Sequence, residues 1–157
     1  MGRRSRTIVA FTAVLLGAVA GCGDDGPQQV SAEELVAEAD AVCTEGRERF
    51  TAIQSEPLRN ANDAENQTRE LIESADDELN ELRDLVPPDE LQEAYNAYLE
   101  ARIRVIEVFR QGLDAAEQDD DQAYVDAQTR AAAGAAKRQE LARAVGFSVC
   151  SAQQEKQ

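Results

Sequence analysis

The chain has 157 residues and a formal charge of −15 at pH 7, and it contains no histidine and no tryptophan. Without histidine it lacks the Ser-His-Asp and Cys-His arrangements of nucleophilic enzymes and the Glu-x-x-His ligands of di-iron bundles. Met1 is the only methionine, so haem ligation through His or Met is excluded as well. The acidic charge disfavours nucleic acid and anionic lipid headgroups, which need basic patches. The composition therefore predicts a protein that is not an enzyme and holds no cofactor.

Residues 1–21 have the three parts of an export signal. Three arginines precede an apolar stretch over residues 8–19, which is short for a membrane span, since spanning takes about 20 apolar residues. An uncleaved anchor helix is the alternative interpretation. The stretch ends in Val19-Ala20-Gly21-Cys22, which resembles the lipobox of bacterial lipoproteins. In such proteins lipid is attached to the cysteine sulfur and the chain is cut before it, so we expect lipidation of Cys22 and anchoring at the extracytoplasmic face of the cell membrane.

Cleavage before Cys22 would leave 13 basic and 31 acidic residues, a formal charge of −18. This charge permits cationic partners or metal ions, although a solvated acidic surface is the simpler interpretation. Residues 22–30 are rich in glycine, acid and amide residues and read as a flexible tether. Residues 31–150 have the length of one domain, and residues 151–157 read as a disordered tail.

The two remaining cysteines, Cys43 and Cys150, would lie in a compartment where disulfides persist. A metal site or a redox centre would need further ligands or a CxxC motif, and the chain has neither. We therefore expect one structural disulfide. Closing a loop of 107 residues would contribute on the order of 4 to 5 kcal/mol in the chain-entropy model.

The domain is rich in Ala, Glu, Leu, Gln and Arg and shows apolar residues at spacings of three and four, which predicts helices. Ser31 and Glu34 form a capping box that starts the first helix, and Cys43 lies on its buried seam. Pro57 ends this helix. Pro87-Pro88 stops the second, because a residue before proline is disfavoured in the helical region.

Pro88 can also open the third helix, where its missing N–H costs nothing. The acidic triplet Asp119-Asp120-Asp121 provides the next turn and N-cap, and it lacks the ligand spacing of a calcium loop. In the fourth helix, the small residues from Ala131 to Ala136 are consistent with simple helix formation, a close helix contact, a groove or a dimer seam. Gly146 can end this helix with Phe147 folded back on its last turn.

Four amphipathic helices with short connections predict an all-α, up-down-up-down four-helix bundle with one disulfide. Counted from the turns, Arg102 and Arg138 lie at the same height, close to Glu73 and Asp76 on the second helix. We therefore predict a polar layer in which the arginines meet one or both acids, because an unpaired buried charge is costly. Alternatively, both arginines lay their stems on apolar surface and carry their guanidinium groups to water.

The whole chain resembles the small lipoproteins and secreted helical proteins of actinobacteria. Besides the lipobox, the resemblance rests on Ala41-Val42-Cys43, Val86-Pro87-Pro88, Tyr95-Asn96-Ala97-Tyr98-Leu99 and the ending Ala144-Val145-Gly146-Phe147-Ser148-Val149-Cys150. It implies two bridged cysteines in a helical domain, and it brings no activity or binding residues with it.

The sequence as a whole favours a lipid-anchored, non-catalytic helical domain that binds or scaffolds a protein partner in the cell envelope. The alternative is a small-ligand binding module that uses the bundle interior. In that case Arg102 and Arg138, with Glu73 and Asp76, are the candidate ligand-binding or polar-layer residues.

Overall fold

The computed structural model describes residues 28–57 and 59–152, and within them the chain is all-α with four packed helices. The helices are α1 (Ala32–Gln54), α2 (Ala61–Arg83), α3 (Gln92–Glu117) and α4 (Asp121–Val145), with a short 3-10 helix η1 (Asp89–Leu91) before α3. The predicted all-α, four-helix fold with one disulfide is confirmed. The export signal and Cys22 lie outside the described residues, so lipidation stays a prediction.

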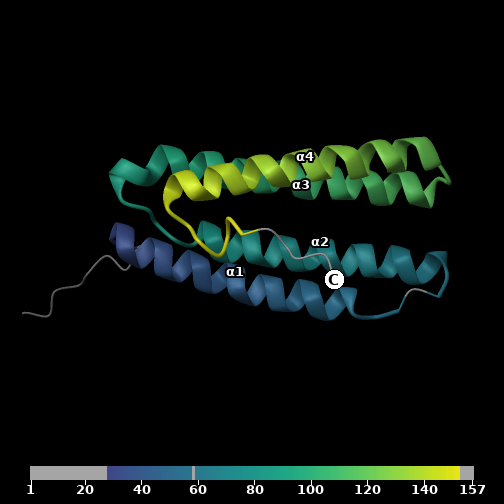
Figure 1. The fold of residues 1–157 in the computed structure, drawn as a ribbon, viewed down its shortest axis with the longest axis horizontal. Coiled ribbons are helices and arrows are strands. Elements are labelled where there is room, and N and C mark those ends of the chain that lie inside the picture. The colour runs from purple at the N-terminus through teal and green to yellow at the C-terminus, as the bar shows by residue number, and fades with distance from the viewer. Residues whose placement is uncertain (1–27, 58, 153–157) are drawn as a thin grey trace, which may run out of the picture.

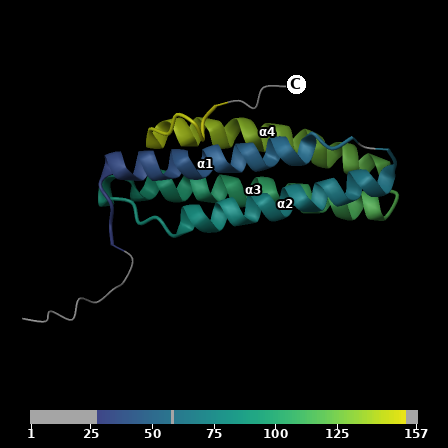
Figure 2. The same ribbon diagram turned by 90° about the horizontal axis from the view of Figure 1, so that it is seen from below.

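The four helices run nearly parallel to one long axis, and each reverses the direction of the one before it (Figure 1). In this view α1 and α2 form one layer, and α3 and α4 form the other. The turned view shows the same elongated bundle, with the segment after α4 returning along it (Figure 2). Within the described part, no helix combines the length and the apolar run needed to cross a bilayer.

The helix ends follow the predicted caps. Ser31 Oγ accepts a hydrogen bond from Glu34 N at 3.2 Å, and the Glu34 carboxylate accepts one from Ser31 N at 2.9 Å, which completes the capping box. Asp120 caps α4 by accepting from Ala123 N at 3.0 Å. These local bonds satisfy amide groups that have no partner inside their helices.

The C-terminus of α4 forms a Schellman motif. Gly146 has a φ of 104°, in the left-handed region that favours glycine. Phe147 N donates to Ala142 O at 3.0 Å, and Gly146 N donates to Arg143 O at 3.1 Å. The chain therefore reverses here, as predicted, and carries Phe147 into the core against Tyr95 and Tyr98.

Several boundaries differ from the prediction, the first being the end of α2, which lies at Arg83 and not at Pro87-Pro88. Pro88 opens only the 3-10 turn, in which Leu91 N donates to Pro88 O at 2.9 Å, and the α-helix starts later at Gln92. The last two residues of the predicted tether are attached to the bundle, since Val30 N donates to Val86 O at 2.9 Å. That carbonyl is free to accept because α2 has already ended at Arg83.

The small residues of α4 serve a close contact with α3. A Cβ built at Gly134 would lie 2.9 Å from Val105 Cγ2, and one built at Gly112 would lie 3.3 Å from Ala127 Cβ. Ala131 is buried in the same contact. Of the four possibilities raised by the sequence, the structure therefore contains the tight helix contact.

Candidate functional site: a cavity lined by arginines

The disulfide ties the end of the chain to α1. Cys43 and Cys150 are bonded, with their Cα atoms 5.2 Å apart. The segment 147–152, called the C-terminal strap here, runs back along the bundle after α4 (Figure 2). Ala152 of this strap lines the cavity described below and is half-buried, although the sequence predicted a disordered tail from residue 151.

Asp40 holds the strap from the other side. Its carboxylate accepts hydrogen bonds from the amides of Ser148 at 3.0 Å, Val149 at 2.9 Å and Cys150 at 3.1 Å, and from Ser148 Oγ at 2.6 Å. Burial alone would raise the pKa of this carboxyl, but these donors outweigh it and lower the pKa below its usual value. Asp40 therefore clamps the strap as a carboxylate.

Arg102 is enclosed in the bundle, with 4% of its surface exposed. Its Nη2 lies 2.6 Å from Glu78 Oε2, and its Nη1 donates to the Tyr98 hydroxyl at 3.0 Å. The Tyr98 oxygen in turn lies 3.6 Å from Cys43 Sγ, and the hydroxyl must be the donor because a disulfide sulfur carries no proton. A continuous polar network thus runs from α2 through α3 to the disulfide.

The environment keeps this network in a defined protonation state. Burial lowers the pKa of Arg102, but Tyr98 and Glu78 raise it by more, so the guanidinium stays a cation. Burial raises the pKa of the Tyr98 hydroxyl, although Arg102 opposes that shift. Tyr98 therefore stays neutral and can donate its proton.

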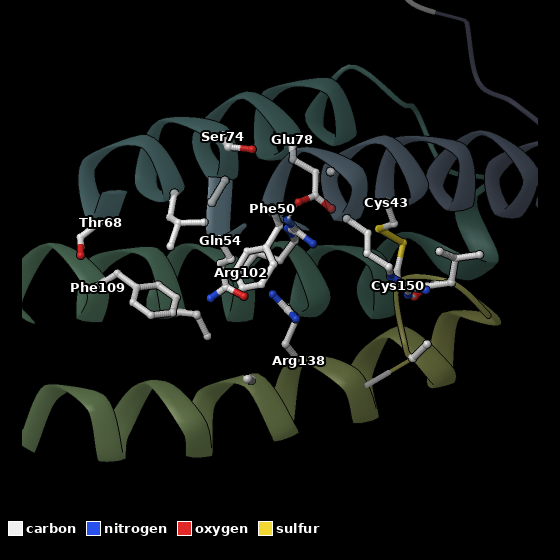
Figure 3. Close-up of a pocket in the computed structure, with 18 of the residues that line it drawn as sticks. Cys43, Phe50, Gln54, Thr68, Ser74, Glu78, Arg102, Phe109, Arg138 and Cys150 are labelled. Carbon is white, nitrogen blue, oxygen red and sulfur yellow. Dashed lines mark hydrogen bonds and ion pairs between the residues drawn. A yellow bond between two sulfur atoms is a disulfide. The ribbon is translucent and has the colours of Figure 1, made fainter. Parts of the chain in front are cut away.

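Arg138 extends from α4 towards Arg102 and lies in the same cavity (Figure 3). Its Nε is buried without a hydrogen-bond partner. No hydrogen bond or ion pair joins its guanidinium to another residue in the part of the chain that the structure describes. Burial, followed by the charge of Arg102, lowers the pKa of Arg138, while Tyr98 and Glu78 oppose this shift. Among the described residues, Arg138 is thus a cation without an ion-pair partner.

The two arginines lie within a cavity of about 330 Å³ formed by all four helices and the strap. That volume is at the lower end of the range of about 300 to 1,000 Å³ for small-molecule sites. Figure 3 shows the disulfide towards one end of the cavity and Phe109 with Thr68 towards the other, with the arginines between them. Apolar side chains supply much of the wall beyond the arginines: Phe50, Leu71, Ala75, Val105 and Phe109.

The structure brings Arg102 and Arg138 together, but with a different acid from the two expected. Glu73 is exposed, and Asp76 pairs with Arg110 at the surface. The prediction of Glu73 and Asp76 assumes that the chain is helical on both sides of Pro87-Pro88.

In fact α2 ends at Arg83, and the non-helical residues 84–88 advance by up to about 3.3 Å each instead of 1.5 Å. Fewer residues are therefore needed to reach the height of Arg102, which selects Glu78 in place of Glu73. Glu78 also follows Leu71 by seven residues, so both lie on the same face of α2.

The arrangement suits electrostatic binding rather than covalent chemistry. Three arginines line the cavity against one glutamate, and Arg47, the third, donates to Val149 O on the strap at 2.7 Å. Within the described residues, no group of three or more His, Cys, Asp or Glu side chains is placed to hold a metal ion. Comparison of the chain with known protein families, with curated proteins and with solved structures finds no match. A proposal of function therefore depends on the chemistry of the residues that line the cavity.

Proposed function

We propose that this chain is a lipid-anchored, non-catalytic, extracytoplasmic module that binds a small anionic ligand inside its helical bundle. The observation that supports it is the Arg138 guanidinium, which points into the cavity and has no ion-pair partner among the described residues. Its neighbour Arg102 already has a partner in Glu78.

The energetics favour a missing ligand over a purely structural role for Arg138. Arg138 is half-buried, its Nε is buried without a hydrogen-bond partner among the described residues, and the second cation Arg102 in the same cavity adds repulsion. A bound anion would remove both penalties, because it would accept hydrogen bonds from Arg138 and reduce the repulsion between the two arginines.

The lipid anchor is supported by the lipobox-like sequence before Cys22 and by the resemblance to actinobacterial lipoproteins. The seven residues between Cys22 and Val30 would keep the bundle within roughly 30 Å of the membrane surface, even when fully extended. The cavity would then sample ligands at the outside of the cell membrane. A protein partner in the cell envelope stays a prediction, and ligand binding in the cavity does not depend on it.

Thermal unfolding of the full chain in phosphatidylcholine vesicles tests this proposal. Sodium acetate, benzoate and phosphate would be added at constant ionic strength, with chloride as the reference. At 100 times its dissociation constant, a bound anion adds about 2.7 kcal/mol to the free energy of unfolding, enough to raise the melting temperature by several degrees.

The shift should disappear in Arg138→Gln. It should persist in the matched control Arg130→Gln, which removes an exposed arginine of the same helix that bonds to Gln111. An equal shift in Arg138→Gln, or no shift with any of the three anions, would contradict the proposal.

A further inference from the structure

We propose that the ligand is an amphipathic monocarboxylate, with its carboxylate on Arg138 and an apolar tail between Phe50 and Phe109. This inference rests on the proposed function and names the class of its ligand. It follows from two properties of the same cavity: the guanidinium of Arg138, which makes no hydrogen bond among the described residues, and the apolar wall that extends from it.

Hydrogen bonding favours a carboxylate head on Arg138. Glu78 pairs with Arg102 at 2.6 Å, and Arg47 donates to the strap carbonyl of Val149, so among the described residues Arg138 is the cavity arginine whose guanidinium makes no hydrogen bond. A planar carboxylate matches the guanidinium fork with two parallel hydrogen bonds. A second negative charge on the ligand would face the carboxylate of Glu78 in the same cavity, which disfavours a phosphate dianion.

The apolar side chains of the cavity wall favour a ligand with an apolar tail. On α3, Val105 and Phe109 follow Arg102 by three and seven residues, so the three lie on one face of the helix and extend over about 10 Å. Leu71 and Phe50 line the cavity from the two helices of the other layer.

Thr68, one of the polar residues of this lining, does not compete for a ligand head. Thr68 Oγ1 already donates to Ala64 O at 2.8 Å within its own helix. Gln54 and Gln128 also line the cavity, and both are exposed to solvent. The space beyond the arginines thus suits methylene groups, and a tail about as long as an eight-carbon chain would fill it.

Calorimetric titration of the full chain in phosphatidylcholine vesicles tests the inference with octanoate, acetate, octanol and octyl phosphate, with protein-free vesicles as the blank. Each buried methylene is worth about 0.8 kcal/mol, close to fourfold in affinity. If only three of the six additional methylenes of octanoate are buried, it should bind on the order of 50-fold more tightly than acetate. Octanol and octyl phosphate should both bind more weakly than octanoate.

Two variants distinguish binding of the ligand's carboxylate from binding of its apolar chain. Arg138→Gln should weaken both carboxylates, whereas Ala75→Leu, which fills the apolar part, should weaken octanoate at least tenfold and leave acetate unchanged. Circular dichroism would verify that each variant folds, and Leu71→Phe would replace Ala75→Leu if the latter did not.

Each other outcome contradicts a defined part of the argument. Equal binding of acetate and octanoate through Arg138 would overturn the tail and leave the proposed function intact. Tighter binding of octyl phosphate would overturn the carboxylate head alone. Octanoate binding that is unchanged in Arg138→Gln, or no binding of any probe, would overturn both the inference and the proposed function.

Discussion

Gly46 on α1 lies directly opposite the carboxylate of Glu78 on α2. A Cβ built at Gly46 would lie 2.6 Å from Glu78 Cδ and 2.7 Å from Glu78 Oε2. Glycine in a helix interior is less favourable than alanine by about 1 kcal/mol, so its presence here has a structural reason. The absence of a side chain makes room for Glu78 at the position from which it pairs with Arg102.

Gly46→Ala should therefore destabilise the protein although alanine is the better helix former. The new methyl group displaces Glu78 and leaves Arg102 poorly paired, a loss that outweighs the gain in helix propensity. We expect the free energy of unfolding to fall by about 1 to 3 kcal/mol in urea titrations at pH 7. In a Glu78→Ala background the same substitution should instead raise it by about 0.5 to 1 kcal/mol. The same sign in both backgrounds would show that Gly46 does not act through Glu78.

The two arginines should have opposite effects on stability. Arg102→Met leaves Glu78 buried without its cation and should lower the free energy of unfolding by about 3 to 5 kcal/mol. Arg138→Met removes a cation that has no partner among the described residues and should raise it by about 0.5 to 2 kcal/mol. Methionine retains most of the apolar stem in both cases.

Urea unfolding monitored by circular dichroism, without added anions, measures both differences under one set of conditions. Arg104→Met, at an exposed position of α3, controls for the loss of a surface arginine and should change little. A loss of stability in Arg138→Met comparable with that in Arg102→Met would mean that Arg138 is a structural residue, not a binding residue.

Local signals in the sequence predict the fold well. The capping box at Ser31, the acidic cap at Asp120 and the left-handed end at Gly146 each act within a few residues, and the structure has all three. The pairing of Cys43 with Cys150 is predicted because only one intramolecular pairing exists once Cys22 is assigned to lipid. These features do not depend on how the helices are set against each other.

The candidate site is predicted only in part, because its contacts depend on helix register. The residues Arg102 and Arg138 are recognisable as charges on apolar seams, but their acid partner is displaced by the non-helical residues 84–88. Gly46 on the apolar seam indicates a close contact, but the sequence does not identify Glu78 as the residue that it contacts. The hydrogen bonds of Asp40 are even harder to predict from the sequence, because they join α1 to a strap more than 100 residues away in sequence.

Asp40 gives the stability of the strap a defined pH dependence. Because hydrogen bonds lower its folded-state pKa, its contribution is fully present above its ordinary pKa, near 4, and is lost as pH falls through the lower folded value. Asp40→Asn should lower the free energy of unfolding by about 1 to 2 kcal/mol at pH 7. Relative to the wild type this deficit should shrink below about pH 4, where the unfolded chain takes up the proton first and the folded chain follows at its lower pKa.

Urea titrations between pH 2 and pH 8 on the wild type and the variant would measure this difference. Glu38→Gln, an exposed acid on the same helix, is the matched control and should show no comparable deficit at neutral pH. A deficit that stays constant down to pH 2 would mean that the charge on Asp40 does not hold the strap.

Replacing Cys43 and Cys150 together by alanine should lower the free energy of unfolding by up to about 4 to 5 kcal/mol, because the unfolded chain is no longer closed into a large loop. The folded strap should nevertheless keep its position, since the Asp40 hydrogen bonds do not involve sulfur. Hydrogen exchange at the amides of Ser148 and Val149 would test this directly. In the variant, we expect both amides to stay protected under conditions in which the protein is folded. Loss of that protection without global unfolding would show instead that the disulfide, and not Asp40, holds the strap against the bundle.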